Sequence, residues 1–242
     1  MTLYRSLLFI ASITMAGPAL AQETDPPAPV TISGGVTAVS DYRWRGVSLS
    51  NEDLAIQPSI TIEHESGLYG TLWGSNIDDT PVYGDVEVDF YAGYAREVAP
   101  GLTLDAGVAY YWYPDGQGDS DFFEPYASLA GTLGPAEAKV GMAYAWNQAA
   151  LGDEDNLYLF GDLAVGVPTT PVTLNAHLGH STGSLGYRSG GYWDWSVGAD
   201  MAVSMFTLGV RYVDSDLDRL TGVPAADTLY DAAVLFSIGV NF

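Results

Sequence analysis

The feature that most constrains this chain is an alternation of period two that recurs from Val30 to Phe242. Apolar residues alternate with small or polar ones over segments of about ten residues, which is the pattern of transmembrane β-strands. In the segment 102–113, one face reads Leu-Leu-Ala-Val-Tyr-Trp and the other reads Thr-Asp-Gly-Ala-Tyr. The pattern predicts about twelve strands, at 30–45, 54–64, 68–77, 85–96, 101–113, 121–133, 136–147, 156–167, 172–181, 191–201, 203–213 and 229–242.

A soluble β-sandwich also alternates, but the connections between these segments favour a barrel. Short connections with turn-forming residues lie at 64–67, 99–101, 134–135 and 168–171. They alternate with longer ones at 46–53, 76–84, 114–120, 147–155, 182–190 and 214–228. We therefore expect an all-β fold, a transmembrane antiparallel β-barrel with short periplasmic turns, longer extracellular loops and both termini in the periplasm.

Aromatic residues cluster at the ends of the predicted strands, next to the long loops. Rings at one level of a barrel form the girdle that sits at a membrane interface, whereas a sandwich would place them nearer its core. The predicted girdle comprises Tyr42, Trp44, Tyr110, Trp112, Tyr144, Trp146, Trp193, Trp195 and Tyr212. The segment 68–77 is ambiguous, because Tyr69 and Trp73 share one face and Leu68 and Leu72 share the other.

The N-terminus has the three parts of a secretory signal peptide. Arg5 supplies the positive charge, an apolar stretch follows up to Met15, and Ala19-Leu20-Ala21 is a cleavage motif. The alternative, an anchor helix, is disfavoured because the apolar stretch is too short to span a bilayer. We expect residues 1–21 to be a signal peptide, 22–29 a short periplasmic segment and 30–242 the barrel. The chain has no Cys and thus no disulfide or thiolate metal site.

A stretch near the predicted first strand resembles a known family. The residues that carry the resemblance are Val36-Thr-Ala-Val-Ser-Asp-Tyr-Arg-Trp-Arg-Gly-Val-Ser-Leu-Ser50, Ala55-Ile-Gln-Pro58, His64-Glu-Ser-Gly-Leu-Tyr69 and Trp73-Gly-Ser-Asn76. They are similar to the TorF family of proteobacterial outer-membrane barrels, which are described as porins. The resemblance covers about residues 30–95 and implies a channel-like barrel with no catalytic residues and no cofactor.

Acidic residues dominate the charge of the chain, whose formal net charge is −22. A surface of this sign repels nucleic acid. The densest charged face on a predicted strand carries Asp85, Glu87 and Asp89. This face is either a solvated part of the lumen or a wall that attracts cations, since rings of carboxylates select cations. No loop has the spacing of a calcium-binding loop.

Most basic residues of the predicted barrel fall on its inward face. Arg43 and Arg45 share the polar face of the first segment with Asp41, and Lys139 and Arg211 are inward on later segments. Because the last strand must pair with the first, Arg211 should approach the two arginines. One interpretation is a constriction with a transverse field. The other is local ion pairing of the arginines with Asp41 and its neighbours.

Three further features of the sequence bear on chemistry or assembly. His177 and His180 could bind a metal, but a spacing of three on a strand sends them to opposite faces. Ser181 beside His180 suggests a hydrolase, yet adjacent strand residues diverge and no nucleophile elbow is present. Phe242 ends an alternating strand and resembles the C-terminal signal read by the outer-membrane assembly machinery.

The sequence thus predicts an outer-membrane channel for passive diffusion of small hydrophilic solutes, with a preference for cations. Its expected partners are outer-membrane lipid and lipopolysaccharide, the barrel assembly machinery and the solutes, but no nucleic acid. No cofactor or enzymatic activity is expected. A non-conducting barrel that serves as a receptor, adhesin or structural protein is the alternative, followed by an outer-membrane hydrolase.

Overall fold

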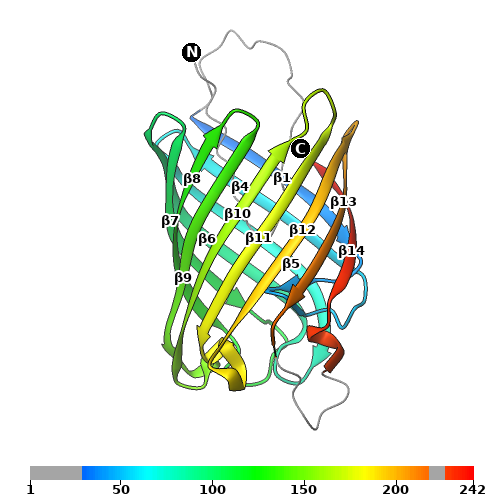
Figure 1. Cartoon of the computed structure of the whole chain (residues 1–242). Helices are drawn as coiled ribbons and strands as arrows, with labels where there is room; N and C mark the ends of the chain where they lie inside the picture. Colours follow the sequence, from blue (N-terminus) through cyan, green and yellow to red (C-terminus); the bar gives the residue numbers. More distant parts are fainter. Residues whose placement is uncertain (1–28, 218–226) are drawn as a thin grey trace.

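The computed structural model describes residues 29–217 and 227–242, which form a closed antiparallel barrel of twelve strands (Figure 1). The predicted signal peptide and most of the predicted segment 22–29 lie outside the described residues. The barrel strands are β1 (Val30–Val39), β4 (Ala55–His64), β5 (Leu68–Thr80), β6 (Gly84–Ala99), β7 (Leu102–Trp112), β8 (Phe122–Leu133), β9 (Ala136–Gln148), β10 (Glu154–Gly166), β11 (Val172–Gly183), β12 (Gly191–Val203), β13 (Phe206–Ser215) and β14 (Ala233–Asn241). Each strand pairs with its neighbours in the chain, and β14 pairs with β1 to close the barrel.

Both termini of the barrel lie at the same end as the short turns, which we call the turn end (Figure 1). The opposite end, the loop end, carries the longer connections and the short 3-10 helices η1 (Ala149–Leu151), η2 (Ser184–Ser189) and η3 (Asp227–Tyr230). One predicted long loop is wrong, because β5 and β6 continue to Thr80 and Gly84 and leave only a tight turn. In the described part of the chain, no helix is long and apolar enough to cross a membrane.

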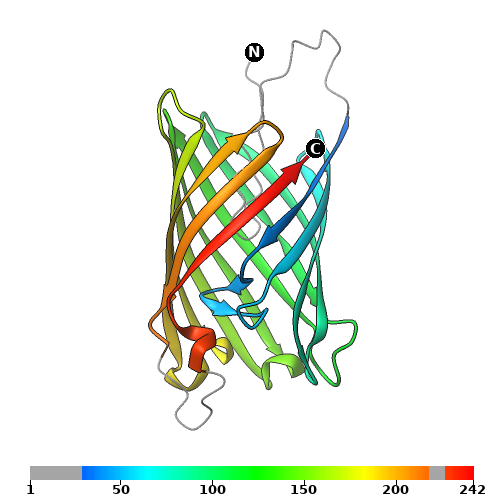
Figure 2. The same cartoon turned by 90° about the vertical axis from the view of Figure 1, so that its right-hand side faces the viewer.

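The predicted first strand is also wrong in its length. β1 ends at Val39 instead of continuing to residue 45, and the connection 40–54 turns into the barrel (Figure 2). It contains a hairpin of β2 (Arg43–Trp44) and β3 (Val47–Ser48). The two residues between them, Arg45 and Gly46, have φ values of 51° and 84°. Two successive left-handed residues are what a tight two-residue hairpin requires, so this local turn takes the chain out of the barrel wall.

The outer face of the barrel is covered by exposed apolar side chains. β4 illustrates the pattern, since Ile56, Ile60 and Ile62 are exposed while Gln57 and Thr61 point inward. In β5 the ambiguity between the two faces is resolved, because the rings of Tyr69 and Trp73 are buried inside and Leu68 and Leu72 are exposed. A continuous apolar surface of this kind is suited to a hydrocarbon environment rather than to water.

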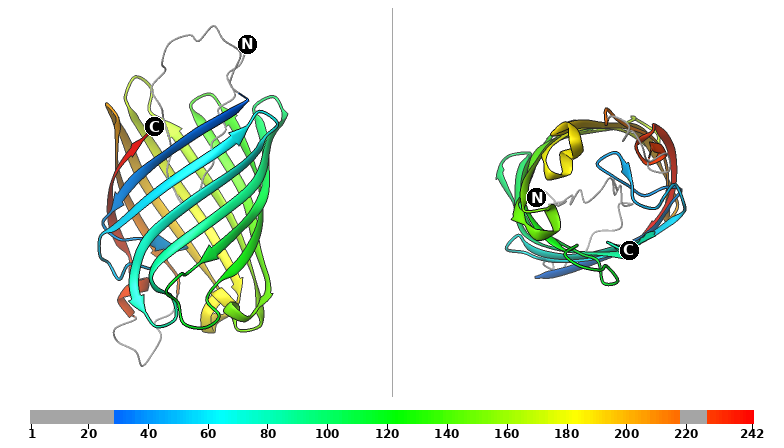
Figure 3. Two further views of the ribbon diagram at one scale, coloured as in Figure 1. Left: turned by 180° about the vertical axis from the view of Figure 1, so that it is seen from behind. Right: turned by 90° about the horizontal axis from the view of Figure 1, so that it is seen from below.

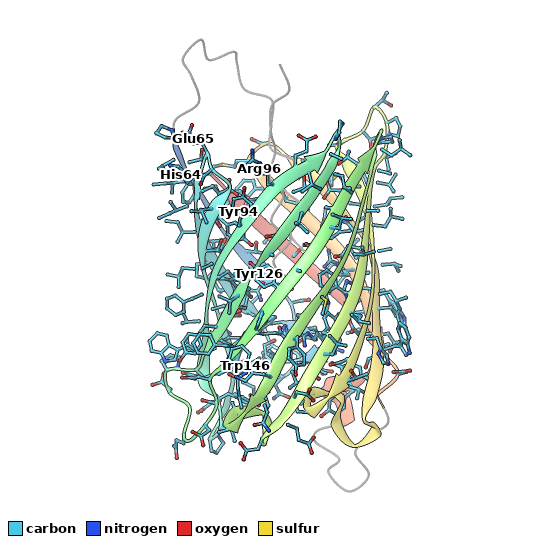
Figure 4. All side chains as sticks on the ribbon, turned by 90° about the vertical axis from the view of Figure 1, so that its left-hand side faces the viewer. His64, Glu65, Tyr94, Arg96, Tyr126 and Trp146 are labelled. Atoms are coloured by element: carbon cyan, nitrogen blue, oxygen red, sulfur yellow. The ribbon has the colours of Figure 1, made fainter. Side chains whose placement is uncertain are left out.

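Aromatic side chains of the outer face gather near the loop end. Trp146 marks this level in Figure 4. Its ring stacks with that of Phe123 at a centroid separation of 6.1 Å. The exposed rings of the belt are those of Trp112, Phe123, Tyr144, Trp146, Trp193 and Tyr212. Tyr42 and Trp44 were predicted to belong to this girdle, and that prediction is wrong. They lie on the inward connection 40–54 and pack inside the barrel.

Candidate functional site

The barrel encloses a cavity of about 300 Å³, and residues of all twelve barrel strands line it. We call it the lumen cavity. It reaches towards the turn end at Thr207 and Asn241, each close to the end of its strand. In the other direction it meets the hairpin of the connection 40–54 at Arg43 and Gly46. Figure 3, seen from the loop end, shows this hairpin inside the ring of strands.

The first half of the inward connection is tied together around Asp41, which is buried. The Nε atom of Arg43 donates to Asp41 Oδ2 at 2.6 Å, and Ser48 Oγ donates to Asp41 Oδ1 at 2.6 Å. Arg43 Nη1 also donates to the backbone oxygen of Asp231 at 2.6 Å. Arg43 therefore braces the connection through Asp41 and links it to the start of β14, as the ion-pairing interpretation expected.

Arg45 anchors the tip of the hairpin to the opposite wall. Its Nη2 atom donates to both carboxylate oxygens of Glu124 on β8, at 2.7 and 2.8 Å. Its guanidinium also lies 4.0 Å from the centre of the Tyr158 ring on β10 and 4.1 Å from that of Trp44. The Tyr192 hydroxyl on β12 donates to the Arg45 backbone oxygen at 2.9 Å. Three separate strands thus hold one residue of the hairpin.

The tip leaves no room for a larger residue at Gly46. A Cβ atom there would lie 3.1 Å from Asp194 Cβ and 3.0 Å from Ser215 Cβ, and the φ of 84° is unfavourable for any side chain. The hairpin is therefore seated against β12 and β13 as well as anchored by Arg45.

Aromatic side chains fill the loop-end half of the lumen around the hairpin. Tyr42 packs on Trp73 with centroids 5.3 Å apart, and Trp44 packs edge-on against Tyr111 at 5.9 Å. Behind them lies a buried cluster that includes Tyr111, Tyr113, Phe122 and Leu151. The lumen is therefore packed at the loop end and hollow towards the turn end. Tyr42, Trp73 and Tyr111 lie where the two parts meet, because they belong to the packed clusters and also line the lumen cavity.

The acidic face of β6 splits into three different environments. Asp85 is exposed near the loop end and does not line the lumen cavity. Glu87 is only 1% exposed and accepts a hydrogen bond from the Tyr113 hydroxyl at 3.1 Å. Asp89 is 2% exposed, lines the cavity and accepts a hydrogen bond from the Tyr91 hydroxyl at 3.0 Å. Glu87 and Asp89 are therefore buried rather than forming a solvated face.

The other two predicted basic residues lie on the cavity wall. Lys139 on β9 and Arg211 on β13 both line the lumen cavity. Their neighbours along the same lining are the carboxylates of Asp105, Asp162 and Asp200. Arg43 and Arg45 reach this cavity from the hairpin instead of from the first strand, and Arg211 lines the same cavity from β13.

His177 belongs to a hydrogen-bonded group that sequence reasoning missed. Its Nδ1 atom lies 2.6 Å from Asp162 Oδ1, and its Nε2 atom lies 2.8 Å from the Tyr158 hydroxyl and 3.1 Å from Asp194 Oδ1. Glu124 was missed in the same way. The available signal was parity, because all of these side chains share the inward face of their strands.

Neither the metal pair nor the hydrolase pair is assembled. His180 points away from His177 and packs against Trp193 with centroids 4.5 Å apart. Ser181 is buried and donates to Asn156 Oδ1 at 3.2 Å, on the face opposite to His180. Within residues 29–217 and 227–242, no group of His, Asp and Glu side chains is arranged to hold a metal ion.

These features define a porin-like β-barrel with an apolar outer face and a polar, partly filled lumen. The chain belongs to the bacterial family of unknown function called Gcw_chp, whose match covers residues 23–242. The fold is similar to that of the NanC porin, with a TM-score of 0.60 and 14% identity over 86% of this chain and 98% of that one. It is also similar to the KdgM porin, with a TM-score of 0.58 and 8% identity over 87% of this chain and 98% of that one. No curated protein sequence matches the chain.

Proposed function

We propose that this protein is an outer-membrane channel, a porin of the TorF type, for passive diffusion of small hydrophilic solutes. The observation that carries the proposal is the lumen cavity, which residues of every barrel strand line, many of them charged, inside a cylinder whose outer face is apolar. A continuous apolar exterior is unfavourable in water and indicates a lipid environment. A polar interior that encloses a cavity is the arrangement expected of a barrel that admits water and solutes. The signal peptide 1–21 would export the chain.

The surroundings proposed for the barrel follow from its surface. The aromatic belt at the loop end would sit at the outer interface, beneath lipopolysaccharide, with phospholipid around the turn end. Phe242 is 79% exposed, while its backbone nitrogen and oxygen bond to Gly34 at 2.9 and 3.0 Å. Its ring is thus accessible beside the closing strand, as an assembly signal read by the barrel assembly machinery would need to be.

Cation preference is part of the proposal because carboxylates outnumber permanent cations along the lumen cavity. The lining carboxylates are Asp41, Asp89, Asp105, Glu124, Asp162, Asp194 and Asp200, whereas the lining basic side chains are Arg43, Arg45, Lys139, His177 and Arg211. Arg43 and Arg45 are neutralised by Asp41 and Glu124. The hairpin therefore narrows the pore by its bulk, and the remaining acidic side chains supply the field.

Single-channel recording of the purified barrel in planar bilayers tests the proposal. We expect discrete conductance steps and, in a salt gradient, a reversal potential of the sign that marks cation selectivity. The preference should weaken as salt rises, because the screening length falls to about 3 Å at 1 M salt. Absence of any steps from protein that is folded by heat-modifiable mobility would refute the channel.

A non-conducting barrel is the second candidate, and one observation favours it. The loop-end half of the lumen is filled by the hairpin and by buried aromatic side chains. The same recording separates the two candidates. A hydrolase receives no support, since Ser181 and His180 lie on opposite faces of β11.

A further inference from the structure

We infer that the lumen cavity holds a binding site for a small organic ammonium ion, built on Asp89 and the aromatic rings around it. The inference deepens the proposed channel function by naming the class of solute. The site, which we call the ammonium site, consists of Tyr42, Trp73, Asp89, Tyr91 and Tyr111, all of which line the lumen cavity.

The rings of the ammonium site form an aromatic wall with edges and faces at several angles. Tyr42 and Trp73 are 5.3 Å apart at an interplanar angle of 59°, and Tyr91 and Tyr111 are 6.4 Å apart at 79°. The site takes its rings from β5, β6, β7 and the inward connection. Faces of Trp and Tyr attract cations through the ring quadrupole, most strongly where water is excluded, and such cages recognise alkylated ammonium groups.

Asp89 supplies the acidic group of the ammonium site and is incompletely satisfied, and a cation bound beside it would favour its ionised form. Its Oδ2 atom accepts the hydrogen bond from Tyr91, but its buried Oδ1 atom has no hydrogen-bond partner within the described residues. A buried carboxylate without a compensating charge is costly. The nearby arginines of the hairpin are already committed, Arg43 to Asp41 and Arg45 to Glu124. A cationic ligand would provide the compensating positive charge that Asp89 lacks.

The surrounding chemistry selects an organic cation over other ligands. Metal ions prefer several oxygen ligands, whereas most of this site is ring surface. Acidic solutes are disfavoured by the excess of lining carboxylates. By contrast, the KdgM porin was solved in complex with an oligogalacturonate, which is an acidic solute. The whole lumen cavity has a volume of about 300 Å³, at the small end of the range for ligand sites, so the ammonium site within it has room only for a small ligand.

The test uses the full barrel folded in detergent, titrated with choline chloride while tryptophan fluorescence and heat are recorded. The matched control ligand is 3,3-dimethylbutan-1-ol, which has the shape of choline without its charge. We expect choline to bind and the neutral alcohol to bind at least about tenfold more weakly, the scale of one charge-assisted contact. Equal binding of the two ligands would overturn the inference, as would a response to sodium or calcium chloride but none to choline.

Two variants locate the site. Asp89→Asn should weaken choline binding by about tenfold. Asp85→Asn is the matched control, because Asp85 lies on the same strand with the same parity but is exposed outside the cavity. If both variants bind choline as the parent does, the site is not at Asp89 and the inference is wrong. Trp73→Leu provides an independent loss of binding if Asp89→Asn fails to fold.

Failure of this inference can be told apart from failure of the channel. Conductance without choline binding would leave the channel standing and remove the ammonium site. Choline binding that depends on Asp89, in a barrel that shows no conductance, would support the site and remove the channel.

Discussion

The two halves of the lumen differ in what fills them. At the loop end, the connection 40–54 enters the barrel and packs with buried rings such as Tyr111 and Phe122. At the turn end, no comparable segment of the described chain enters, and the charged wall of Asp162, Asp200 and Arg211 borders open space. Twelve strands enclose more room than their own side chains fill. Whether a connection folds inward therefore decides whether that part of the lumen is filled or open.

The two halves of the lumen also differ in how their charged side chains are paired. At the loop end, Arg43 and Arg45 are each held by a close carboxylate partner, Asp41 or Glu124, whereas Asp162, Asp200 and Arg211 lie along the turn-end wall of the cavity. If the proposed channel is correct, the loop-end half would stabilise the barrel and the turn-end wall would set the selectivity.

Labelling tests which end of the barrel lies on which side of the membrane. Asp153 and Thr169 are exposed residues in connections at opposite ends of the barrel. Their φ values are similar, 60° and 65°, so a Cys is equally strained at either site. The chain contains no other Cys. A membrane-impermeant maleimide added to intact cells should label Asp153→Cys and leave Thr169→Cys unlabelled. The reverse pattern would invert the topology.

Removing the hairpin should open the loop end. Deletion of residues 43–48 takes away the segment that fills that half and the Arg45 anchor with it. We expect a several-fold rise in single-channel conductance with normal heat-modifiable mobility. An unchanged conductance in folded protein would mean that the hairpin does not narrow the pore.

Breaking the anchor should destabilise the barrel and loosen the hairpin. Arg45→Met or Glu124→Gln leaves a buried partner uncompensated, which costs about 3–5 kcal/mol in unfolding free energy. The double variant should lose less than the sum of the single losses, because neither partner then remains alone. Urea unfolding in lipid vesicles measures this. Arg96→Met, at an exposed site on β6, is the control and should change stability by less than about 0.5 kcal/mol.

The smallest expected effect concerns selectivity. Asp162→Asn and Asp200→Asn together should lower the cation preference, since both carboxylates line the turn-end wall. Asp85→Asn should leave it unchanged. Reversal potentials at about 0.1 M salt, where the screening length is about 10 Å, provide the measurement. A shift from Asp85→Asn about half as large as that of the double variant would assign selectivity to the total charge instead of to the wall.

Much of the fold could be predicted because a barrel strand is specified locally. Period-two alternation determines which face of each strand meets lipid, and the turn residues limit where strands end. All twelve predicted segments correspond to barrel strands. The inward positions of Lys139, Asp89 and Arg211 follow from parity alone.

The sequence by itself therefore determined the strand number, the two faces and the closed barrel, whereas only the tertiary structure decided where the connection 40–54 lies. Its alternation continues past Val39 and is indistinguishable from strand, so Tyr42 and Trp44 were expected to face lipid. The left-handed pair Arg45–Gly46 and a carboxylate 79 residues away, Glu124, hold it inside. A contact between residues so far apart in the chain leaves no local pattern, because its energy exists only once the barrel has closed.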